Sequence, residues 1–378
     1  MNDTRLGHGI GGDFGLSLAK LYEPDRQDFR AFFDTEERAY ILFDSGRSAL
    51  KRCLQDLAFN RNEIFLLPSY ICPAVLQPFN ELHVHYEFYE VDDQLRINVE
   101  SIKRKMRRNV RGLLIIHYFG FPVATEFSDY WGEFQNRPIL VEDCSQALLT
   151  RQDGKWLGRR GDYSFTSLRK WLPVPDGAWL FSKHELPDID LSSEKTGFLS
   201  KRMLGIILKD AYLKQEYTSE EEYQSYLRLL REAEAALDAQ SDIVGISDWT
   251  VKLLNKFDWQ AIMSSRQHNY RRLVSCLEDI KAIRPLFPEL PRGVCPLGFP
   301  IIVNSPEGRD RLKEFLVQHG IYPPIHWKLP MEVNETEFLE SWNLSRRILT
   351  IPIDQRYSET EMEYICNVLQ ISERQLQY

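Results

Sequence analysis

Residues 138–182 read PILVEDCSQALLTRQDGKWLGRRGDYSFTSLRKWLPVPDGAWLFS, and this stretch decides the fold. It opens with an apolar run over residues 139–141, which is typical of a buried parallel strand. Asp143 follows at the carboxyl end of this strand, where open α/β sheets bind their ligands, and Gln146 comes shortly after it. The stretch therefore predicts an acid and an amide at the ligand-binding edge of a sheet.

A second strand is predicted over residues 163–166, and it leads directly to Lys170. An acid, an amide and a lysine at neighbouring strand ends suit a cofactor that is a heterocyclic aldehyde. The acid can keep a ring nitrogen of the cofactor protonated, and the lysine can form a Schiff base with the aldehyde.

A phosphate-binding turn is expected upstream of this stretch. Residues 40–43 have the pattern of a short strand, and Ser45-Gly46-Arg47-Ser48 then opens a helix. Such a turn presents free backbone N–H groups at the positive end of the helix dipole, which favours a phosphate. The alternative is a simple capped helix start that binds no ligand.

Strands and helices alternate along most of the chain before residue 120. Further strands are predicted over residues 63–67, 84–89 and 113–116, with a helix over residues 99–106. This alternation predicts an α/β fold whose mainly parallel sheet is covered on both faces. His117 follows one of these strands, where a lone histidine is more often a structural hydrogen-bonding group than a catalyst.

The last third of the chain predicts a smaller α+β domain. A long helix over residues 259–277 enters it, followed by strands at 297–303 and 348–351 and helices at 306–319 and 358–369. Gly320 suits a left-handed cap after one helix, and a Ser-x-x-Glu capping box opens the last one. We therefore expect an N-terminal arm (1–16), a large domain (17–258), and a connecting helix with a small domain (259–378).

The arm is rich in glycine. Its string Gly7-x-Gly9-x-x-Gly12 fits the dinucleotide-binding fingerprint in spacing. No strand precedes it and no amphipathic helix follows it, so a flexible arm is the better expectation.

Composition narrows the function classes. With 378 residues, 43% hydrophobic and 27% charged, the chain resembles an ordinary globular protein of about two domains. A net charge of −8 argues against general nucleic-acid binding but leaves room for a local basic pocket. Six scattered cysteines, without a signal peptide or a membrane-length apolar run, favour a cytoplasmic protein with free thiols and no metal site.

Several motifs, taken in order, resemble those of the DegT/DnrJ/EryC1/StrS aminotransferases, and the resemblance covers most of the chain. Each motif alone is weak, but their common order is specific. They are Ser45-Gly-Arg-Ser-Ala-Leu50, Leu67-Pro-Ser-Tyr70, Ile116-His-Tyr-Phe-Gly120, Asp143-x-x-Gln146 with the following Gly-Asp-Tyr-Ser-Phe and Pro-Asp-Gly177 segments, and Arg347-Ile-Leu-Thr-Ile-Pro352.

The resemblance implies a pyridoxal 5'-phosphate enzyme of fold type I, with a three-layer αβα large domain. It implies an aminotransferase that moves an amino group from an amino acid, with glutamate the expected donor, to a keto-sugar, often one linked to a nucleotide. It also implies a homodimer in which each active site lies at the subunit boundary and a residue of the second subunit helps to neutralise the cofactor phosphate.

The resemblance also assigns roles to individual residues. Asp143 and Lys170 are expected to be catalytic, and Gln146 to donate a hydrogen bond to the phenolic oxygen of the cofactor. Tyr70 could stack on the cofactor ring, because Cys72 occupies the position where the family usually has an aromatic residue. The phosphate is expected to contact Gly46, Arg47, Ser48 and Ser167, with Ser164 as the runner-up to Ser167.

Two adjacent residues, Arg169 and Lys170, compete for the position of the family's lysine. The family's Ser-Phe-x-x-x-Lys pattern, counted from Ser164, ends on Arg169, and arginine stays protonated and forms no Schiff base. Lys170 is therefore the chemical candidate, with a Ser167-x-x-Lys170 spacing that is common in fold type I enzymes.

Other departures keep alternatives open. Arg47 and Ala178 replace the family's usual Thr and Gly, and no Asn-Tyr-Arg loop is found near residues 249–259, where Lys252 and Asn255 stand. A pyridoxal-phosphate sugar dehydratase or lyase is one alternative, although the family's dehydratases often replace the lysine. A non-catalytic binding or regulatory protein is the other. The loop at residues 326–328 either faces the site or is solvated.

Overall fold

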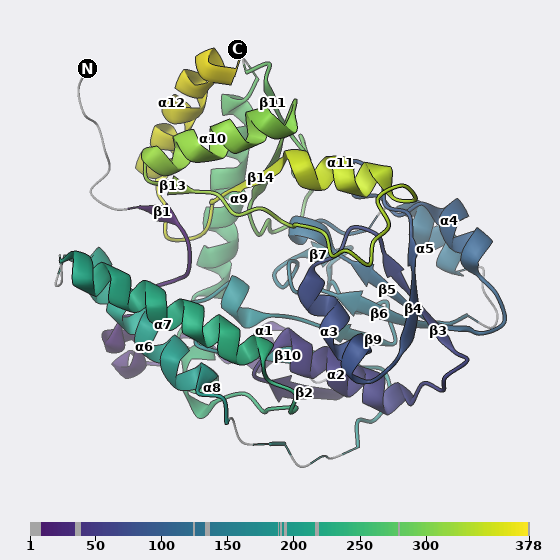
Figure 1. The fold of residues 1–378 in the computed structure, drawn as a ribbon. Helices are drawn as coiled ribbons and strands as arrows, with labels where there is room; N and C mark the ends of the chain where they lie inside the picture. The colour runs from purple at the N-terminus through teal and green to yellow at the C-terminus, as the bar shows by residue number, and fades with distance from the viewer. Residues whose placement is uncertain are drawn as a thin grey trace.

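The structure is a computed structural model, and it describes residues 9–34, 39–123, 125–132, 137–187, 189, 191–192, 195–215, 219–278 and 280–376. Figure 1 shows two domains joined by the long helix α9 (Trp259–Cys276). The lower, larger domain contains a seven-stranded sheet, and the upper, smaller one contains a three-stranded sheet.

The large sheet has the strand order β2-β10-β9-β6-β5-β3-β4. β10 runs antiparallel to both of its neighbours, whereas the pairs from β9 to β4 are parallel. The strands are β2 (Ala39–Phe43), β3 (Ile64–Pro68), β4 (His85–Tyr89), β5 (Val110–Ile116), β6 (Ile139–Asp143), β9 (Tyr163–Phe165) and β10 (Ala178–Ser182).

Both faces of this sheet are covered. Leu113, Leu114 and Ile115 are consecutive residues of β5, so their side chains alternate between the two faces, yet each is 0% exposed. The sheet is therefore the middle of three layers, which confirms the expected fold class. The helices of this domain are α1 (Phe29–Phe32), α2 (Gly46–Leu57), α3 (Pro73–Glu81), α4 (Val99–Lys105), α5 (Thr125–Gly132), α6 (Phe198–Leu213), α7 (Glu220–Asp238) and α8 (Asp248–Leu254).

Short elements connect these layers. Three 3-10 turns are η1 (Leu18–Tyr22), η3 (Tyr118–Gly120) and η4 (Leu168–Lys170), and a small hairpin joins β7 (Arg151–Gln152) to β8 (Lys155–Trp156). Helices α6 and α7 lie side by side at one flank of the large domain (Figure 1). The capping box that opens α7 pairs Ser219 with Glu222.

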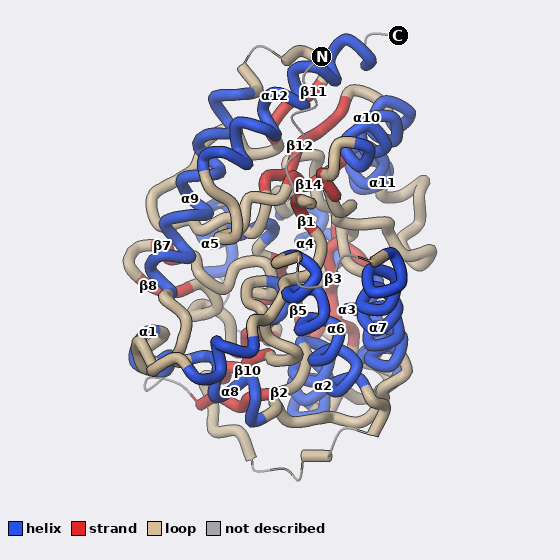
Figure 2. Tube along the Cα trace, turned by 90° about the vertical axis from the view of Figure 1, so that its left-hand side faces the viewer, coloured by secondary structure: helices blue, strands red, loops and turns tan. Residues whose placement is uncertain are grey.

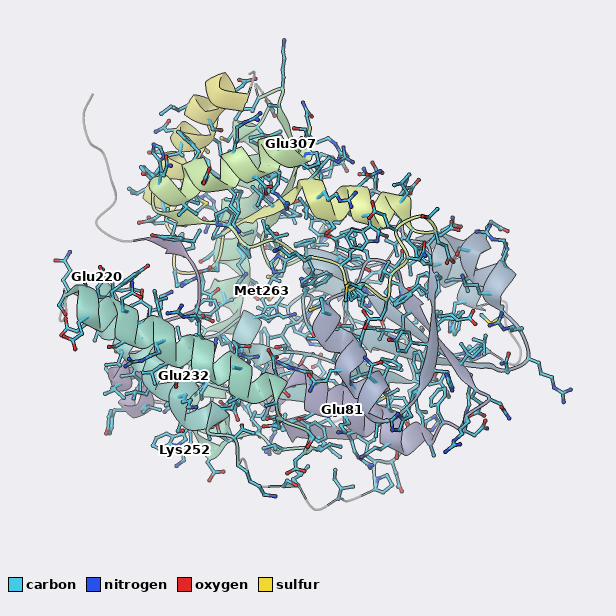
Figure 3. All side chains as sticks on the ribbon, in the orientation of Figure 1. Glu81, Glu220, Glu232, Lys252, Met263 and Glu307 are labelled. Atoms are coloured by element: carbon cyan, nitrogen blue, oxygen red, sulfur yellow. The ribbon has the colours of Figure 1, made fainter. Side chains whose placement is uncertain are left out.

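The small domain packs helices onto an antiparallel sheet of order β11-β12-β14. Figure 2 shows these elements grouped at the top of the molecule. They are β11 (Ile283–Pro285), β12 (Phe299–Val303), α10 (Pro306–Gln318), α11 (Leu339–Arg347), β14 (Ile348–Ile351) and α12 (Glu359–Leu376). Met263, labelled in Figure 3, lies on α9 among the side chains between the two domains, and it is buried.

The N-terminal arm is packed rather than flexible over the residues that the structure describes. β1 (Ile10–Gly11) pairs in parallel with β13 (Ile321–Tyr322) of the small domain, and the Gly11 N–H donates to the Tyr357 hydroxyl at 2.6 Å. Ile10 is 1% exposed and Leu16 is also buried. The expectation of a flexible arm is wrong here, because the arm's few apolar residues find partners far along the chain. Gly7 lies outside the described residues.

The described residues contain neither a membrane-spanning helix nor a metal-binding cluster. No described helix is both long enough and apolar enough to cross a membrane. Among the same residues, no cluster of three or more His, Cys, Asp or Glu side chains is arranged to hold a metal ion.

Candidate functional site

The carboxyl end of β6 presents Asp143 and Gln146, as the sequence predicts. Asp143 is 6% exposed, and its Oδ1 accepts a hydrogen bond from the backbone N–H of Ser145 at 2.8 Å. The Gln146 Oε1 accepts a hydrogen bond from the backbone N–H of Phe119 at 2.8 Å. Its Nε2 is buried and has no hydrogen-bond partner in the described part of the chain. A buried amide donor without an acceptor is costly, so this position is suited to a bound ligand oxygen.

Lys170 ends the turn η4 with its side chain exposed. Its amine forms no hydrogen bond or ion pair with any residue that the structure describes. Its charge acts on two neighbours. Burial and, to a smaller extent, the positive charge of Lys170 lower the pKa of His326 to about 3. Burial raises the pKa of the Cys72 thiol, whereas Lys170 opposes this shift and Asp143 adds to it. Lys170 and Asp143 therefore lie within electrostatic reach of the same thiol.

The side chain of Arg169 has different surroundings from those of Lys170. Its guanidinium forms an ion pair with Glu234 of α7 at 2.5 Å and lies 5.3 Å from the ring centre of Phe198. Arg169 is thus fixed in a charge network, and Lys170 supplies the unpaired amine.

The predicted phosphate turn lies at the N-terminus of α2. The Ser45 hydroxyl caps the helix by accepting from the Ser48 N–H at 3.2 Å, and the Ser48 hydroxyl donates to Asp44 Oδ1 at 2.7 Å. The backbone N–H groups of Gly46 and Arg47 have no partner among the described residues. A Cβ at Gly46 would lie 3.3 Å from the carbonyl oxygen of Thr166, so the turn passes close to the end of β9.

The Arg47 side chain is held away from this turn. Its Nη1 donates to Asp238 at 2.6 Å and to Gln77 at 2.9 Å, at the end of α7 and on α3. Only the backbone of Arg47 is then available to a phosphate at the helix N-terminus.

The two serines that are candidates for the phosphate contact, Ser164 and Ser167, have different surroundings. Ser167 caps η4 and lines the cavity beside Lys170. Ser164 is 2% exposed and packs against Gly158, where a Cβ would lie 2.7 Å from its hydroxyl oxygen. Ser167 is therefore the serine with access to a ligand.

Tyr70 joins the two domains. It is 0% exposed, and its ring packs against Tyr118 and Trp327 with centroid distances of 5.8 and 5.7 Å. Its hydroxyl donates to the backbone carbonyl of His326 and accepts from the Trp327 N–H at 3.1 Å. These contacts are those of a core residue that anchors the loop of His326, and a stacking role on a cofactor stays a prediction.

His117 has the structural role that its position indicates. It is 1% exposed, its Nδ1 accepts from the Val123 N–H at 3.2 Å, and its Nε2 therefore donates to Glu142 at 2.8 Å. Burial tends to raise the pKa of Glu142, but the hydrogen bond from His117 and those from backbone N–H groups lower it overall.

No Asn-Tyr-Arg loop takes shape near α8. Instead the Asn255 side-chain oxygen accepts from the Phe29 N–H at 3.0 Å, and Lys256 donates to Asp25 at 3.1 Å. These residues bind the start of α1 within the same chain.

A cavity of about 550 Å³ opens beside Lys170, between the arm, the large domain and the small domain. Many of its lining residues are charged, and sequence reasoning singled out only Lys170 among these. The charged lining residues are Asp13, Arg169, Lys170, Arg202, Glu234, Arg266, Lys313, Asp354 and Arg356.

One of the missed residues carried a local signal. The buried side of α9 follows a helical spacing through Ile262, Met263, Arg266, Asn269 and Tyr270, so a charged residue falls in a buried stripe. Asp13 and Arg356 had no local sequence signal, because the hydrogen bond from Arg356 Nη1 to the Asp13 carbonyl links residues 343 positions apart.

The residues at this edge fit pyridoxal phosphate. The unpartnered amide donor of Gln146 and the carboxylate of Asp143 suit a ring with a phenolic oxygen and a protonated nitrogen. The unpaired amine of Lys170 suits an aldehyde, and the free N–H groups at Gly46 and Arg47 suit a phosphate.

Sequence comparison finds a similarity to one family of aminotransferases. The model of the DegT/DnrJ/EryC1/StrS aminotransferase family matches residues 26–177, a segment that contains Asp143, Gln146 and Lys170. This segment is similar to that family, and it covers less than half of the chain. The matched segment thus includes the phosphate turn and ends at Gly177, directly before β10.

Two curated relatives that are similar to this chain in sequence are GDP-perosamine synthases. That of Vibrio cholerae is 23% identical over 177 residues, which are 45% of this chain and 46% of the relative. That of Escherichia coli O157:H7 is 22% identical over 121 residues, which are 32% of this chain and 33% of the relative. The matched segments thus span at most about half the length of these relatives.

Solved structures of aminotransferases share the fold over almost the whole chain. The aminotransferase TlmJ from Streptoalloteichus hindustanus is 15% identical, with a TM-score of 0.70 over 98% of this chain and 100% of that one. Helicobacter pylori PseC, described as an aminotransferase in pseudoaminic acid biosynthesis, is 13% identical, with a TM-score of 0.68 over 97% and 100%. This likeness shows the fold type I architecture.

Proposed function

We propose that this chain is a pyridoxal-phosphate-dependent aminotransferase that transfers an amino group from an amino acid, such as glutamate, to a keto-sugar linked to a nucleotide. One observation carries the proposal. The carboxylate of Asp143, the unpartnered amide of Gln146 and the unpaired amine of Lys170 all follow the carboxyl ends of the neighbouring parallel strands β6 and β9. The names of the relatives, GDP-perosamine synthase and an enzyme of pseudoaminic acid biosynthesis, support the sugar substrate.

When bound, pyridoxal phosphate supplies an electrophilic aldehyde and a ring that accepts electrons. The Asp143 carboxylate keeps a proton on the ring nitrogen, because an opposite charge at short range favours the protonated form. Gln146 Nε2 donates to the phenolic oxygen. The N–H groups of Gly46 and Arg47 bind the phosphate at the positive end of α2.

Lys170 has two tasks in this proposal. It holds the cofactor covalently, and once the amino donor has displaced it, its free amine moves a proton between two carbon atoms. A pKa of about 3 keeps His326 neutral around pH 7, so this imidazole adds no second positive charge beside the Lys170 amine. Residues of the small domain and of the arm line the cavity beside this amine.

The proposed assembly is a homodimer, and the proposed compartment is the cytoplasm. All six cysteines are free thiols, which fits a reducing compartment. The phosphate turn draws no side-chain cation from Arg47, which is paired with Asp238, so a second subunit can supply the missing charge.

The function is tested by single-turnover spectroscopy. Purified protein loaded with pyridoxal phosphate is mixed with glutamate, and conversion of the aldehyde form to the amine form is followed by absorbance. Nucleotide-linked keto-sugars are then screened for the one that restores the aldehyde form. A protein that binds the cofactor but exchanges no amino group with any amino acid would contradict the proposal.

A further inference from the structure

The cavity beside Lys170 has more positive than negative charge in its lining. It has about 550 Å³, within the range of small-molecule sites, and it opens onto Ser167 and the Lys170 turn. Six cations and three carboxylates line it, which leaves an excess of three positive charges (6 − 3 = 3).

The three carboxylates are already paired with arginines of the same cavity. Arg202 binds Asp13 at 2.5 Å and Glu234 at 2.9 Å, and Arg356 binds Asp354 at 2.7 Å. With Arg169 also held by Glu234, the cations without an ion pair among the described residues are Lys170, Arg266 and Lys313.

Arg266 is the unusual member of these three, because it is 1% exposed. Its Nε donates to Gln355 at 2.9 Å, and its Nη1 donates to the carbonyl oxygens of Pro296 and Leu297 at 3.3 and 2.7 Å. Its guanidinium lies 4.7 Å from the ring centre of Trp171. These partners are all neutral, and no hydrogen bond from Nη2 to a described residue is found.

A buried cation held only by neutral groups is costly, and it fixes a donor ready for an anion. Burial lowers the pKa of Arg266 despite the nearby charge of Asp354, which is the expected effect of an uncompensated charge. The position is also close to the chemistry, because Trp171, which contacts Arg266, directly follows Lys170 in the chain.

We propose that Arg266 is the oxyanion-recognition residue of the substrate cavity. This inference rests on the proposed function, in which both substrates react in turn at Lys170. Nη2 of Arg266 donates to a carboxylate or phosphate oxygen of the substrate, and Lys313 on α10, which is half-buried, adds a second positive charge to the same cavity. The substrate is thus recognised as an anion while its reacting end meets Lys170.

Two sources can supply the oxyanion: the carboxylate of an amino-acid donor or the diphosphate of a nucleotide-linked acceptor. Calorimetric titration distinguishes them without turnover. Protein loaded with pyridoxal phosphate is titrated with glutarate, a dicarboxylate that carries no amino group, and separately with guanosine diphosphate. Binding of glutarate assigns the site to the donor, and binding of the nucleotide assigns it to the acceptor.

The decisive variant is Arg266→Gln, with Arg271→Gln as its matched control. Arg271 lies on the same helix, is exposed and forms no ion pair with a described residue. We expect the probe that binds the wild type to bind the control equally well. Its affinity for Arg266→Gln should be weaker by about tenfold or more, because a hydrogen bond between charged groups is lost.

Three outcomes would overturn the inference. The first is that neither probe binds the wild type. The second is that Arg266→Gln binds the same probe as tightly as the wild type does. The third is that Arg266→Gln melts at a lower temperature while its affinity for the probe is unchanged. The last is the result of a purely structural role. If Arg266→Gln does not fold, Lys313→Ala decides, and we expect affinity for the same probe to fall several-fold; unchanged affinity would overturn the inference.

The titrations separate this inference from the proposed function. If no amino acid converts the cofactor but Arg266→Gln abolishes anion binding, the aminotransferase proposal fails and the oxyanion site stands. If amino transfer occurs and Arg266→Gln changes neither anion affinity nor the KM of either substrate, the oxyanion site fails alone.

Discussion

Arg169 forms an ion pair with Glu234 at 2.5 Å, whereas Lys170, its neighbour in the chain, has no ion pair among the described residues. A one-residue shift along η4 thus separates a fixed guanidinium from a free amine. Counting from Ser164 places the family's lysine at Arg169, but the surroundings of the two side chains favour Lys170.

The first prediction concerns covalent attachment. Borohydride reduction of the protein loaded with pyridoxal phosphate should fix the cofactor on Lys170, because an unpaired amine beside the cofactor edge is the available nucleophile. Peptide mapping by mass spectrometry locates the label. Lys155→Ala, which removes an exposed lysine of β8, should keep the label, and Lys170→Ala should lose it. A label on Lys155 or Lys183 would contradict the assignment.

The second prediction concerns Asp143. Asp143→Asn should leave the fold and cofactor binding largely intact, because the amide oxygen can still accept from the Ser145 N–H. Turnover should fall by about a hundredfold or more, since a neutral amide cannot stabilise the protonated ring nitrogen. Steady-state rates with the amino donor measure this loss, and circular dichroism checks the fold. Unchanged turnover would remove Asp143 from the site.

The third prediction tests the unpartnered donor of Gln146. In Gln146→Glu, one carboxylate oxygen can still accept from the Phe119 N–H, but the buried N–H₂ group becomes a second acceptor. Cofactor affinity should fall by about tenfold or more, because a donor to the phenolic oxygen is replaced by a repelling charge. Equilibrium binding of pyridoxal phosphate measures it, with Gln152→Glu in β7 as the control. Equal affinity in both variants would argue against a ligand oxygen at this amide.

Sequence reasoning located the sheet and the cofactor edge because both depend on local patterns. The apolar run before Asp143 and the strand before Lys170 are short segments whose ends fix the side chains that follow. The predicted strand at residues 113–116 is β5 with three further residues at 110–112, and the strand at 348–351 is β14 as predicted. The strand β10 at Ala178–Ser182 was not predicted, since its antiparallel pairing with β2 joins residues far apart.

The residues that line the cavity could not be predicted from the sequence for the same physical reason. Ile10 pairs with Ile321, and Arg202 of α6 binds Asp13 of the arm, so the wall is made by contacts between remote segments. No local periodicity marks such contacts. For Tyr70 the sequence signal exists but is ambiguous. An aromatic residue near a strand end has the same signal whether its ring contacts a ligand or, as here, Trp327.

The fourth prediction is a loss of stability in acid through the arm network. Burial tends to raise the pKa of Glu234, but Arg169 and Arg202 lower it below its ordinary value of 4.5 overall. Since the folded pKa is the lower one, the contribution of Glu234 to stability is present above pH 4.5 and is lost as the pH falls through the folded pKa. Asp13 changes in the same direction.

Glu234→Gln should therefore lower the free energy of unfolding at pH 7 by about 1 kcal/mol, because two arginines lose a shared carboxylate that solvent partly screens. Urea titrations at pH 7 and pH 4 measure the difference. The gap between wild type and variant should narrow at the lower pH. Glu232→Gln, one of the labelled residues on α7 in Figure 3, is the control, since its pairing with Lys201 at 3.8 Å is at the surface. A constant gap at both pH values would contradict the assignment.

The last prediction is that cofactor binding depends on a homodimer. The N–H groups of Gly46 and Arg47 have no partner in the described part of the chain, but the Arg47 side chain is paired with Asp238 and gives the phosphate dianion no charge. Backbone N–H groups and a helix dipole hold a phosphate weakly unless a cation adds to them. In the proposed homodimer, the second subunit would supply this cation. Diluting the loaded protein until light scattering reports a monomer should thus release the cofactor and the activity together. A monomer that still holds pyridoxal phosphate tightly would show that one chain completes its own phosphate site.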